Sequence, residues 1–287
     1  MHPDYLVLRL MRRFIPQSLF RALLRRSLFV RPGIETRAPE LALDEYRSLL
    51  VQAGLSLDAK RVLLLGYGGN FTLGCMLLHQ GASHVTLLDP FAPPNDRANA
   101  ALLDVPEFAP FLVEEGAAVR PRPQFMSLLQ ADICDLVPGT LVEPFDLALS
   151  RSVFEHLKDV EGVTRALAAL TKPSGMNLHL IDLSDHYFKY PFEMLSYSEK
   201  VWRNWLNPPS NLNRWRYQDY RRVFEENYTA VTITVQLSDQ AAFLRARSRI
   251  RPEFLSADPR DSGTEAATFI AVLAAGPKKP QTKASID

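Results

Sequence analysis

The order of apolar and polar stretches predicts alternating strands and helices along most of the chain. Short apolar runs bounded by glycine, proline or charged residues predict strands near 61–65, 84–88, 122–129, 145–150 and 177–181. Helices are expected near 38–58, 70–80 and 159–171, with a turn at 172–175. Alternation of this kind predicts a mostly parallel sheet with helices on both faces.

The C-terminal pattern is different. A helix is expected near 217–227, followed by strands near 229–236 and 266–274, which brings the expected strands to seven. No confident crossover helix joins the last two strands, so we expect them to pair antiparallel. Residues 277–287 are rich in lysine and proline and are expected to be disordered.

Residues 1–37 concentrate arginine. Eight arginines stand against two carboxylates, a net charge of +6, and Pro16 divides the segment into two expected helices. In the second helix, five apolar residues share one face and three arginines the other: Leu19, Phe20, Leu23, Leu24 and Leu28 against Arg21, Arg25 and Arg26. Two interpretations stay open, a basic arm on an anionic membrane or a helix pair that caps the following domain with solvated arginines.

Composition narrows the class of protein. The 287 residues are 47% hydrophobic and 23% charged with a net charge of +1, as in ordinary globular proteins, and nothing indicates a nucleic-acid partner. Two cysteines indicate a reducing compartment. No apolar run is long enough to span a bilayer, and the first residues do not resemble a signal peptide. We therefore expect a cytoplasmic protein, or one held at the inner face of the membrane. The oligomeric state stays open.

A glycine turn and a carboxylate carry the first sign of function. The turn Gly66-Tyr67-Gly68-Gly69-Asn70 follows the strand at 61–65, and its glycines let the backbone approach a ligand. Asp89 ends the next strand about 20 residues later, where it would accept hydrogen bonds from ribose hydroxyls. The pattern predicts a site for an adenosine-containing cofactor, formed by Gly66, Tyr67, Gly68, Asn70, Asp89 and Pro90.

The turn lacks the last glycine of the dinucleotide pattern Gly-x-Gly-x-x-Gly. It resembles the first motif of class I S-adenosylmethionine (SAM)-dependent methyltransferases, acid-x-Gly-x-Gly-x-Gly. Gly66 and Gly68 match, whereas Asn70 replaces the third glycine and Leu64 the acid. The resemblance covers about residues 55–275. It implies SAM as the cofactor and a Rossmann-like, doubly wound, seven-stranded sheet in residues 56–276, with N-terminal helices in 1–55 and an aromatic-rich helical cap.

The resemblance extends to two further cofactor motifs. Asp132 is implied to bind the adenine amine, and Ile133 to cover the ring. The run from Ser150 and Arg151 to a Glu-His pair resembles the fourth motif of small-molecule methyltransferases, with Ser150 and Arg151 at the cofactor.

Two histidines are candidate bases. His156, beside Glu155, titrates near neutral pH like any imidazole. His186 follows Asp182 closely, and a carboxylate can orient an imidazole and stabilise its cationic form. Which of the two acts stays open. The sequence shows no compact set of converging carboxylates, so no metal is expected.

An insertion at 187–222 is expected to cap the acceptor. It holds all three tryptophans, together with tyrosines, asparagines and arginines that suit a polyhydroxylated or aromatic molecule. The predicted contacts are Tyr187, Trp202, Trp205, Arg214 and Trp215. The surrounding runs look like a bacterial subgroup that modifies sugars, glycans or secondary metabolites.

We expect O-methylation of a sugar, glycolipid or secondary-metabolite hydroxyl. Methylation of a nitrogen or carboxyl group stays open, as does an inactive methyltransferase-like scaffold, because Leu64 and Asn70 depart from the motif. A nucleotide-dependent reductase is disfavoured by the lack of a Tyr-x-x-x-Lys pair beside the fourth strand. A nucleic-acid methyltransferase is disfavoured by the lack of an Asn-Pro-Pro-Tyr-type motif there.

Overall fold

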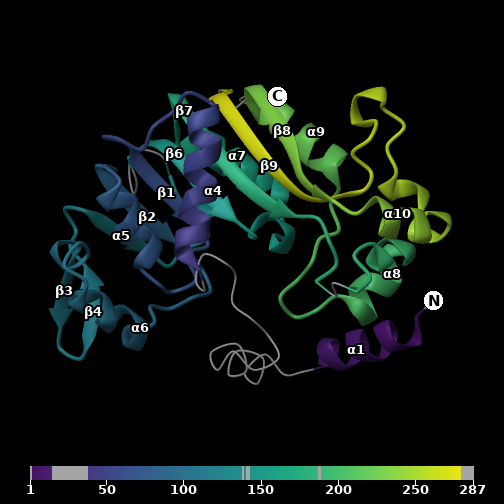
Figure 1. Ribbon diagram of the computed structural model, residues 1–287, viewed down its shortest axis with the longest axis horizontal. Helices are drawn as coiled ribbons and strands as arrows, with labels where there is room; N and C mark the ends of the chain where they lie inside the picture. The colour runs from purple at the N-terminus through teal and green to yellow at the C-terminus, as the bar shows by residue number, and fades with distance from the viewer. Residues whose placement is uncertain (1, 15–37, 138, 140–142, 187–188, 279–287) are drawn as a thin grey trace, which may run out of the picture.

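The computed structural model describes residues 2–14, 38–137, 139, 143–186 and 189–278. Seven strands form one sheet in the order β5-β2-β1-β6-β7-β9-β8 (Figure 1). Their bounds are β1 Arg61–Leu65, β2 His84–Leu88, β5 Met126–Leu129, β6 Phe145–Arg151, β7 Thr171–Asp182, β8 Tyr228–Ser238 and β9 Ala267–Pro277. The first five run parallel, and β9 is antiparallel to β7 and β8. The predicted doubly wound sheet and its antiparallel end are confirmed.

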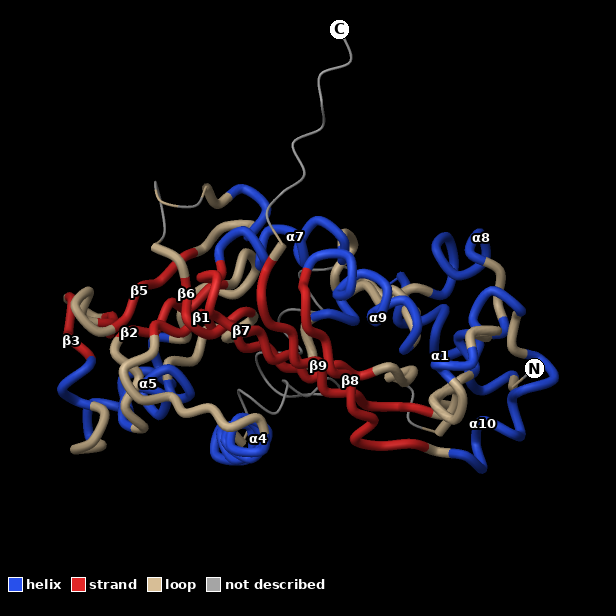
Figure 2. The backbone as a smooth tube through the Cα atoms, turned by 90° about the horizontal axis from the view of Figure 1, so that it is seen from above, coloured by secondary structure: helices blue, strands red, loops and turns tan. Residues whose placement is uncertain are grey.

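Helices cover both faces of this sheet, as predicted (Figure 2). On one face, α4 (Pro39–Gln52) and α5 (Thr72–His79) bury their apolar sides against β1 and β2. On the other, α7 (Val160–Leu170) and α9 (Tyr217–Asn227) pack against β6, β8 and β9. Because the central strands are buried on both faces, their sequences are almost wholly apolar rather than alternating.

The register places the functional turns side by side. Leu65 pairs with Leu88 on one side and with Ser150 on the other, so β1, β2 and β6 end at the same edge. The segments that follow these three strands therefore meet beyond their carboxyl ends, where open α/β sheets bind ligands.

Two local features differ from the predictions. The expected turn at 172–175 lies within β7 as a bulge. Phe145 pairs with Thr171 and Leu147 with Met176, so four residues of β7 stand opposite one residue of β6. The expected strand near 122–129 is shorter, and a hairpin of β3 (Leu112–Glu115) and β4 (Ala118–Pro121) precedes it. Gly116, with a φ of 63°, allows this tight hairpin turn. A short helix, α6 (Asp96–Ala100), follows the prolines after β2.

A separate helical cap lies beyond one end of the sheet (Figure 1). It combines α1 (Pro3–Phe14), α8 (Glu199–Val201), a π-helical turn at Trp202–Leu206 and α10 (Gln240–Ala246) around a core of its own. The cap therefore draws on more of the chain than the predicted insertion. The second expected N-terminal helix and the C-terminal tail lie outside the described residues. None of the helices in the described ranges has the length and apolar character that a membrane crossing requires.

Candidate functional site

The glycine loop after β1 depends on backbone conformations that favour glycine. Gly66, Gly68 and Gly69 have φ angles of 83°, 67° and 84°. A Cβ on Gly66 would lie 2.3 Å from Val153 Cγ2, and one on Gly69 would lie 2.4 Å from the carbonyl oxygen of Pro93. The loop is therefore packed between two other segments, and one of them leads directly into the Glu-His turn.

Asp89 supports this loop from the end of β2. Its Oδ2 accepts a hydrogen bond from the Gly68 N–H at 3.2 Å, and its Oδ1 accepts from the N–H groups of Phe91 and Ala92 at 2.8 and 3.0 Å. Asp89 and Pro90 are half-buried, so a ligand can reach them. Tyr67 is only 3% exposed and donates to the Ala92 carbonyl, so its side chain serves the loop rather than a ligand.

Two asparagines hold the far side of the loop. Asn70 Oδ1 accepts from the backbone N–H and the hydroxyl of Thr72, at 2.8 and 2.6 Å, at the start of α5. Asn99, from α6, is fully buried. It accepts from the Phe71 N–H and donates to the Gly69 carbonyl, both at 3.0 Å. The sequence analysis missed Asn99, because an amide near the prolines resembles any surface amide.

Two further predicted cofactor residues, Asp132 and Ile133, differ in exposure. Asp132 is exposed and begins the short 3₁₀ turn Ile133–Asp135 by accepting from the Cys134 N–H at 2.9 Å. Ile133 is packed into the core beneath it. Both residues follow β5, the neighbour of β2 in the sheet.

Ser150 and Arg151 are engaged elsewhere. Ser150 is fully buried with its hydroxyl 2.8 Å from His179 Nδ1, and Arg151 makes two hydrogen bonds, at 2.7 and 3.2 Å, to the Glu45 carboxylate of α4. Their predicted cofactor contacts stay predictions. We assign Ser150 to the core of the sheet and Arg151 to the anchoring of α4.

Glu155 lies in the 3₁₀ turn Phe154–His156 that follows β6. Its side chain is 2% exposed, and neither carboxylate oxygen completes a hydrogen bond with any described residue. Burial and the nearby Asp182 carboxylate raise the pKa of Glu155 well above its ordinary value, and the backbone N–H groups of Glu155 and Asp182 offset this only in part.

The next residue, His156, is held by the cap. Its Nδ1 lies 2.7 Å from the carbonyl oxygen of Asn211, and the Asn211 amide donates back to the His156 carbonyl at 3.0 Å. A carbonyl oxygen can only accept, so the proton is on Nδ1. In the neutral ring, Nε2 then carries a lone pair.

Asp182 and His186 follow β7. Asp182 Oδ1 accepts from the Ser184 N–H and hydroxyl at 2.8 and 2.6 Å, and its Oδ2 lies 3.8 Å from His186 Nε2. Burial raises the pKa of Asp182, with Ser184 opposing the shift. The His156 and His186 rings lie edge to face with centroids 5.0 Å apart.

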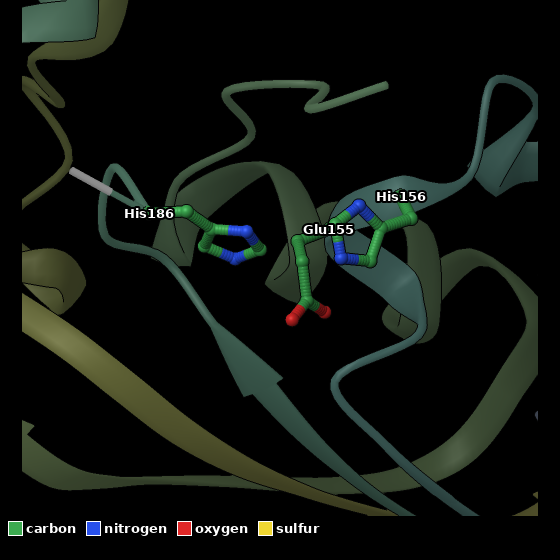
Figure 3. A group of neighbouring side chains, drawn as sticks. All are labelled: Glu155, His156 and His186. Atoms are coloured by element: carbon green, nitrogen blue, oxygen red, sulfur yellow. The ribbon is translucent and has the colours of Figure 1, made fainter. Parts of the chain in front are cut away.

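The fold thus brings together all four residues proposed for proton removal. Figure 3 shows Glu155 between the two imidazole rings, and one ligand atom from each of these three side chains lies within 4.8 Å of the others. The sequence analysis found no compact set of converging carboxylates and therefore expected no metal. The structure brings together one carboxylate and two imidazoles, which does not test that expectation. Two neighbouring parallel strands, β6 and β7, bring these groups to one edge of the sheet.

Helix α1 fixes the loop that carries His186. Asp185 is fully buried, accepts a 2.6 Å hydrogen bond from the Tyr5 hydroxyl, and is paired with the Arg9 guanidinium. Arg9 is itself 2% exposed and lies over the Trp202 ring at 5.0 Å. The N-terminal segment therefore does cap the domain, but Arg9 is buried in an ion pair, unlike the solvated arginines of that interpretation.

The predicted acceptor contacts fall into two groups. Trp202 and Arg214 are 1% and 2% exposed. Trp202 donates to the Leu212 carbonyl, and Arg214 donates to the carbonyls of Met194 and Tyr197. Both therefore pack in the core of the cap, and their predicted contact with an acceptor stays a prediction.

The remaining predicted contacts are placed differently. Trp215 is half-buried against Tyr220 of α9, with ring centroids 5.5 Å apart. Trp205 is 54% exposed beside Phe14 of α1. Tyr187 lies outside the described residues. Only Trp205 thus presents a large aromatic surface among these tryptophans.

The sheet order, the glycine loop and the polar groups beyond the carboxyl ends define an α/β protein with a nucleotide-type site. Residues 13–239 match the sequence model of a family described as "Methyltransferase domain", and the chain belongs to that family. No curated protein matches it.

Solved structures show similar chain traces at low identity. One is the Burkholderia thailandensis 1,6-didemethyltoxoflavin-N1-methyltransferase, with 14% identity, a TM-score of 0.48, and coverage of 97% of this chain and 91% of that one. Another is the N-methyltransferase NodS from Bradyrhizobium japonicum, with 13% identity, a TM-score of 0.44, and coverage of 82% and 87%. Likenesses at this level say nothing about what this chain binds.

Proposed function

We propose that this protein is a SAM-dependent methyltransferase that methylates a hydroxyl group of a sugar, glycolipid or secondary metabolite. The observation that carries the proposal is the direct packing of the glycine loop on the Glu-His turn, through Gly66 and Val153. A cofactor held by the loop would then lie next to groups that can accept a proton. Such an arrangement suits group transfer to an acceptor that must lose a proton.

The residues present fit SAM as the cofactor. The loop brings backbone close to a ligand without side chains in the way, and Asp89 is the carboxylate for ribose hydroxyls. Asp132 is exposed for the adenine amine, although it also caps the 3₁₀ turn that follows. When bound, the sulfonium supplies an activated methyl group, and the protein supplies orientation and a path for the proton.

Proton removal is assigned to the Glu155, His156, Asp182 and His186 cluster. In neutral His156, Nε2 keeps its lone pair because Nδ1 donates to Asn211. His186 faces the Asp182 carboxylate, which would stabilise its protonated form. An oxygen acceptor requires such a group more than an amine does, because a hydroxyl is a weak nucleophile until it loses its proton, whereas a neutral amine is already a good one. The cluster is therefore the reason for favouring oxygen over nitrogen.

Methyl transfer can be tested with SAM that carries a deuterated methyl group. The full chain would be incubated with panels of sugars, glycolipids, phenols and amines, and products detected by mass spectrometry. We expect the label on an oxygen. We also expect His156→Asn or His186→Asn to lower kcat by about 10²- to 10⁴-fold without changing the affinity for S-adenosylhomocysteine. His79→Asn, an exposed histidine on α5, is the matched control. Label on nitrogen, or unchanged kcat in both variants, would contradict the assignment.

We also propose that the N-terminal helix contacts an anionic membrane. Its outward face exposes Val7, Met11 and Phe14 by 56%, 62% and 64%, beside the exposed Trp205. The segment 1–37 adds a net charge of +6. Flotation with vesicles of anionic lipid should recover the protein, and vesicles of zwitterionic lipid should not. Met11→Ser combined with Phe14→Ser should abolish the difference, and equal recovery on both lipids would refute it.

A further inference from the structure

Glu155 is an unusual group to find in a folded chain. It is 2% exposed, and both of its oxygens lack a hydrogen-bond partner among the described residues. Burying a carboxylate without a donor or a cation costs several kcal/mol, so native proteins nearly always pair such groups. The residues that the structure describes do not supply such a partner, and a bound cation would serve as one.

The groups around Glu155 suggest what that partner is. His156 and His186 lie on either side of it, from the ends of β6 and β7 (Figure 3). The hydrogen bond to the Asn211 carbonyl puts the proton of the neutral His156 ring on Nδ1, so that Nε2 carries the lone pair. A second hydrogen bond that fixes the tautomer of an imidazole is a common feature of metal-binding histidines.

We propose that Glu155, His156 and His186 bind a divalent transition-metal cation. Two imidazoles and one carboxylate are ligands that zinc, manganese, iron and cobalt accept, whereas magnesium and calcium prefer oxygen alone. The three ligand atoms now lie within 4.8 Å of one another, and bonds of about 2.1 Å require them to approach further. Both histidines are half-buried.

Asp182 completes the surroundings of this site. Its Oδ2 faces His186 at 3.8 Å while its Oδ1 is held by Ser184, so it is placed to orient His186 rather than to bind the cation. Three protein ligands leave at least one coordination position for a further oxygen atom, as in catalytic zinc sites. The site therefore resembles a centre that binds a small molecule more than a closed structural centre.

The role of the cation rests on the proposed function and deepens it. An acceptor hydroxyl bound to the cation gives up its proton more readily, and the proton passes to water. The acceptor oxygen then forms a bond to the methyl carbon, while the electron pair of the broken carbon–sulfur bond stays on sulfur. In the metal-loaded protein the two imidazoles are ligands, and the cation replaces a free imidazole base. The acceptor would thus be a hydroxyl able to coordinate a metal.

The cation can be measured without any acceptor. The full chain would be treated with a chelator, dialysed, and titrated with Zn²⁺ by calorimetry and with Co²⁺ by absorption spectroscopy. We expect one high-affinity cation per chain, a Co²⁺ spectrum of nitrogen and oxygen ligands, and a higher Tm in the presence of Zn²⁺. Glu155→Gln should weaken binding by at least about 100-fold. His79→Gln, far from the site in sequence, should leave it unchanged.

Loss of folding would not obscure this test. Glu155→Gln removes a buried charge while keeping the shape, so the metal-free variant should have a higher Tm than the metal-free native protein. His186→Gln, at a half-buried position, serves as the second variant. Equal Zn²⁺ binding by the native protein and both variants, or no binding at all, overturns the inference.

Titration with S-adenosylhomocysteine in the same samples separates the two proposals. Cofactor binding without metal binding would leave the proposed function standing and refute the metal site. Metal binding without cofactor binding would support the metal site and refute the proposed function.

Discussion

Asn99 is the single residue on which the glycine loop most depends. Its amide joins the Gly69 carbonyl to the Phe71 N–H from within the core. Asn99→Ala leaves both groups buried without this partner, so we expect a loss of about 1–3 kcal/mol in the free energy of unfolding. S-adenosylhomocysteine should bind about 10-fold more weakly, because the loop loses its fixed shape. Urea unfolding and calorimetry measure the two effects, and an unchanged affinity would show that the loop does not need Asn99.

His179 gives the protein a defined response to acid. Burial lowers the pKa of this residue from 6.5 to about 3. Between these values the unfolded chain binds a proton that the folded chain does not, so the free energy of unfolding falls as the pH falls through this range. At about pH 5 the loss from His179 is about 2 kcal/mol.

His179→Gln tests this contribution, because glutamine keeps a polar partner for Ser150. Urea unfolding at about pH 7.5 and about pH 5 should show a smaller loss of stability in the variant, by about 2 kcal/mol. His79→Gln, at an exposed position, should behave like the native protein. The same pH dependence in both variants would refute the assignment.

Residues whose contacts are local in the sequence could be predicted, whereas residues with distant partners could not. Gly66 and Asp89 could be predicted, because a turn and a strand end are local features with a known spacing. Asn99 and Arg9 could not, since each acts through partners far away in the chain. The burial of Trp202 and Arg214 in the cap could not be predicted for a related reason: an aromatic and a guanidinium suit a ligand and a buried core equally well.

At the scale of elements, the strands and helices of the domain follow from the hydrophobic pattern. The strands β1 and β2 lie where short apolar runs predicted them, and α9 has the predicted bounds. The β7 bulge and the β3–β4 hairpin were missed, because the pairing of neighbouring strands decides them. The docking of α1 was one of two open interpretations, but its buried ion pair was missed, since Arg9 and Asp185 are 176 residues apart in the chain.

That ion pair leads to a prediction about α1. Arg9→Met removes the guanidinium from the fully buried Asp185, so we expect a loss of about 3 kcal/mol in the free energy of unfolding. Asp185→Asn added to Arg9→Met should restore part of this, because no buried charge then remains. Urea unfolding of the two single variants and the double variant gives the coupling energy. Additive losses would contradict a direct pairing.

For the molecule as a whole, two halves meet at one edge of the sheet. The glycine loop, Asp89 and Asp132 follow β1, β2 and β5, whereas the Glu155 cluster follows β6 and β7 under the cap. The chain thus separates the groups proposed for a cofactor from the groups proposed for an acceptor and its proton. The positions of the loops after β1, β2 and β5 could be predicted from the order of the strands. The cap could not, because it is built from segments that are far apart in the sequence.

The central claim is that this edge binds SAM. Calorimetric titration of the full chain with S-adenosylhomocysteine and, in parallel, NADPH tests it most directly. We predict micromolar binding of the sulfur nucleotide alone. Asp89→Asn should weaken it by about 10- to 100-fold, and the exposed Asp96→Asn on α6 should not. Binding of NADPH, or of neither compound, would contradict a SAM-dependent methyltransferase.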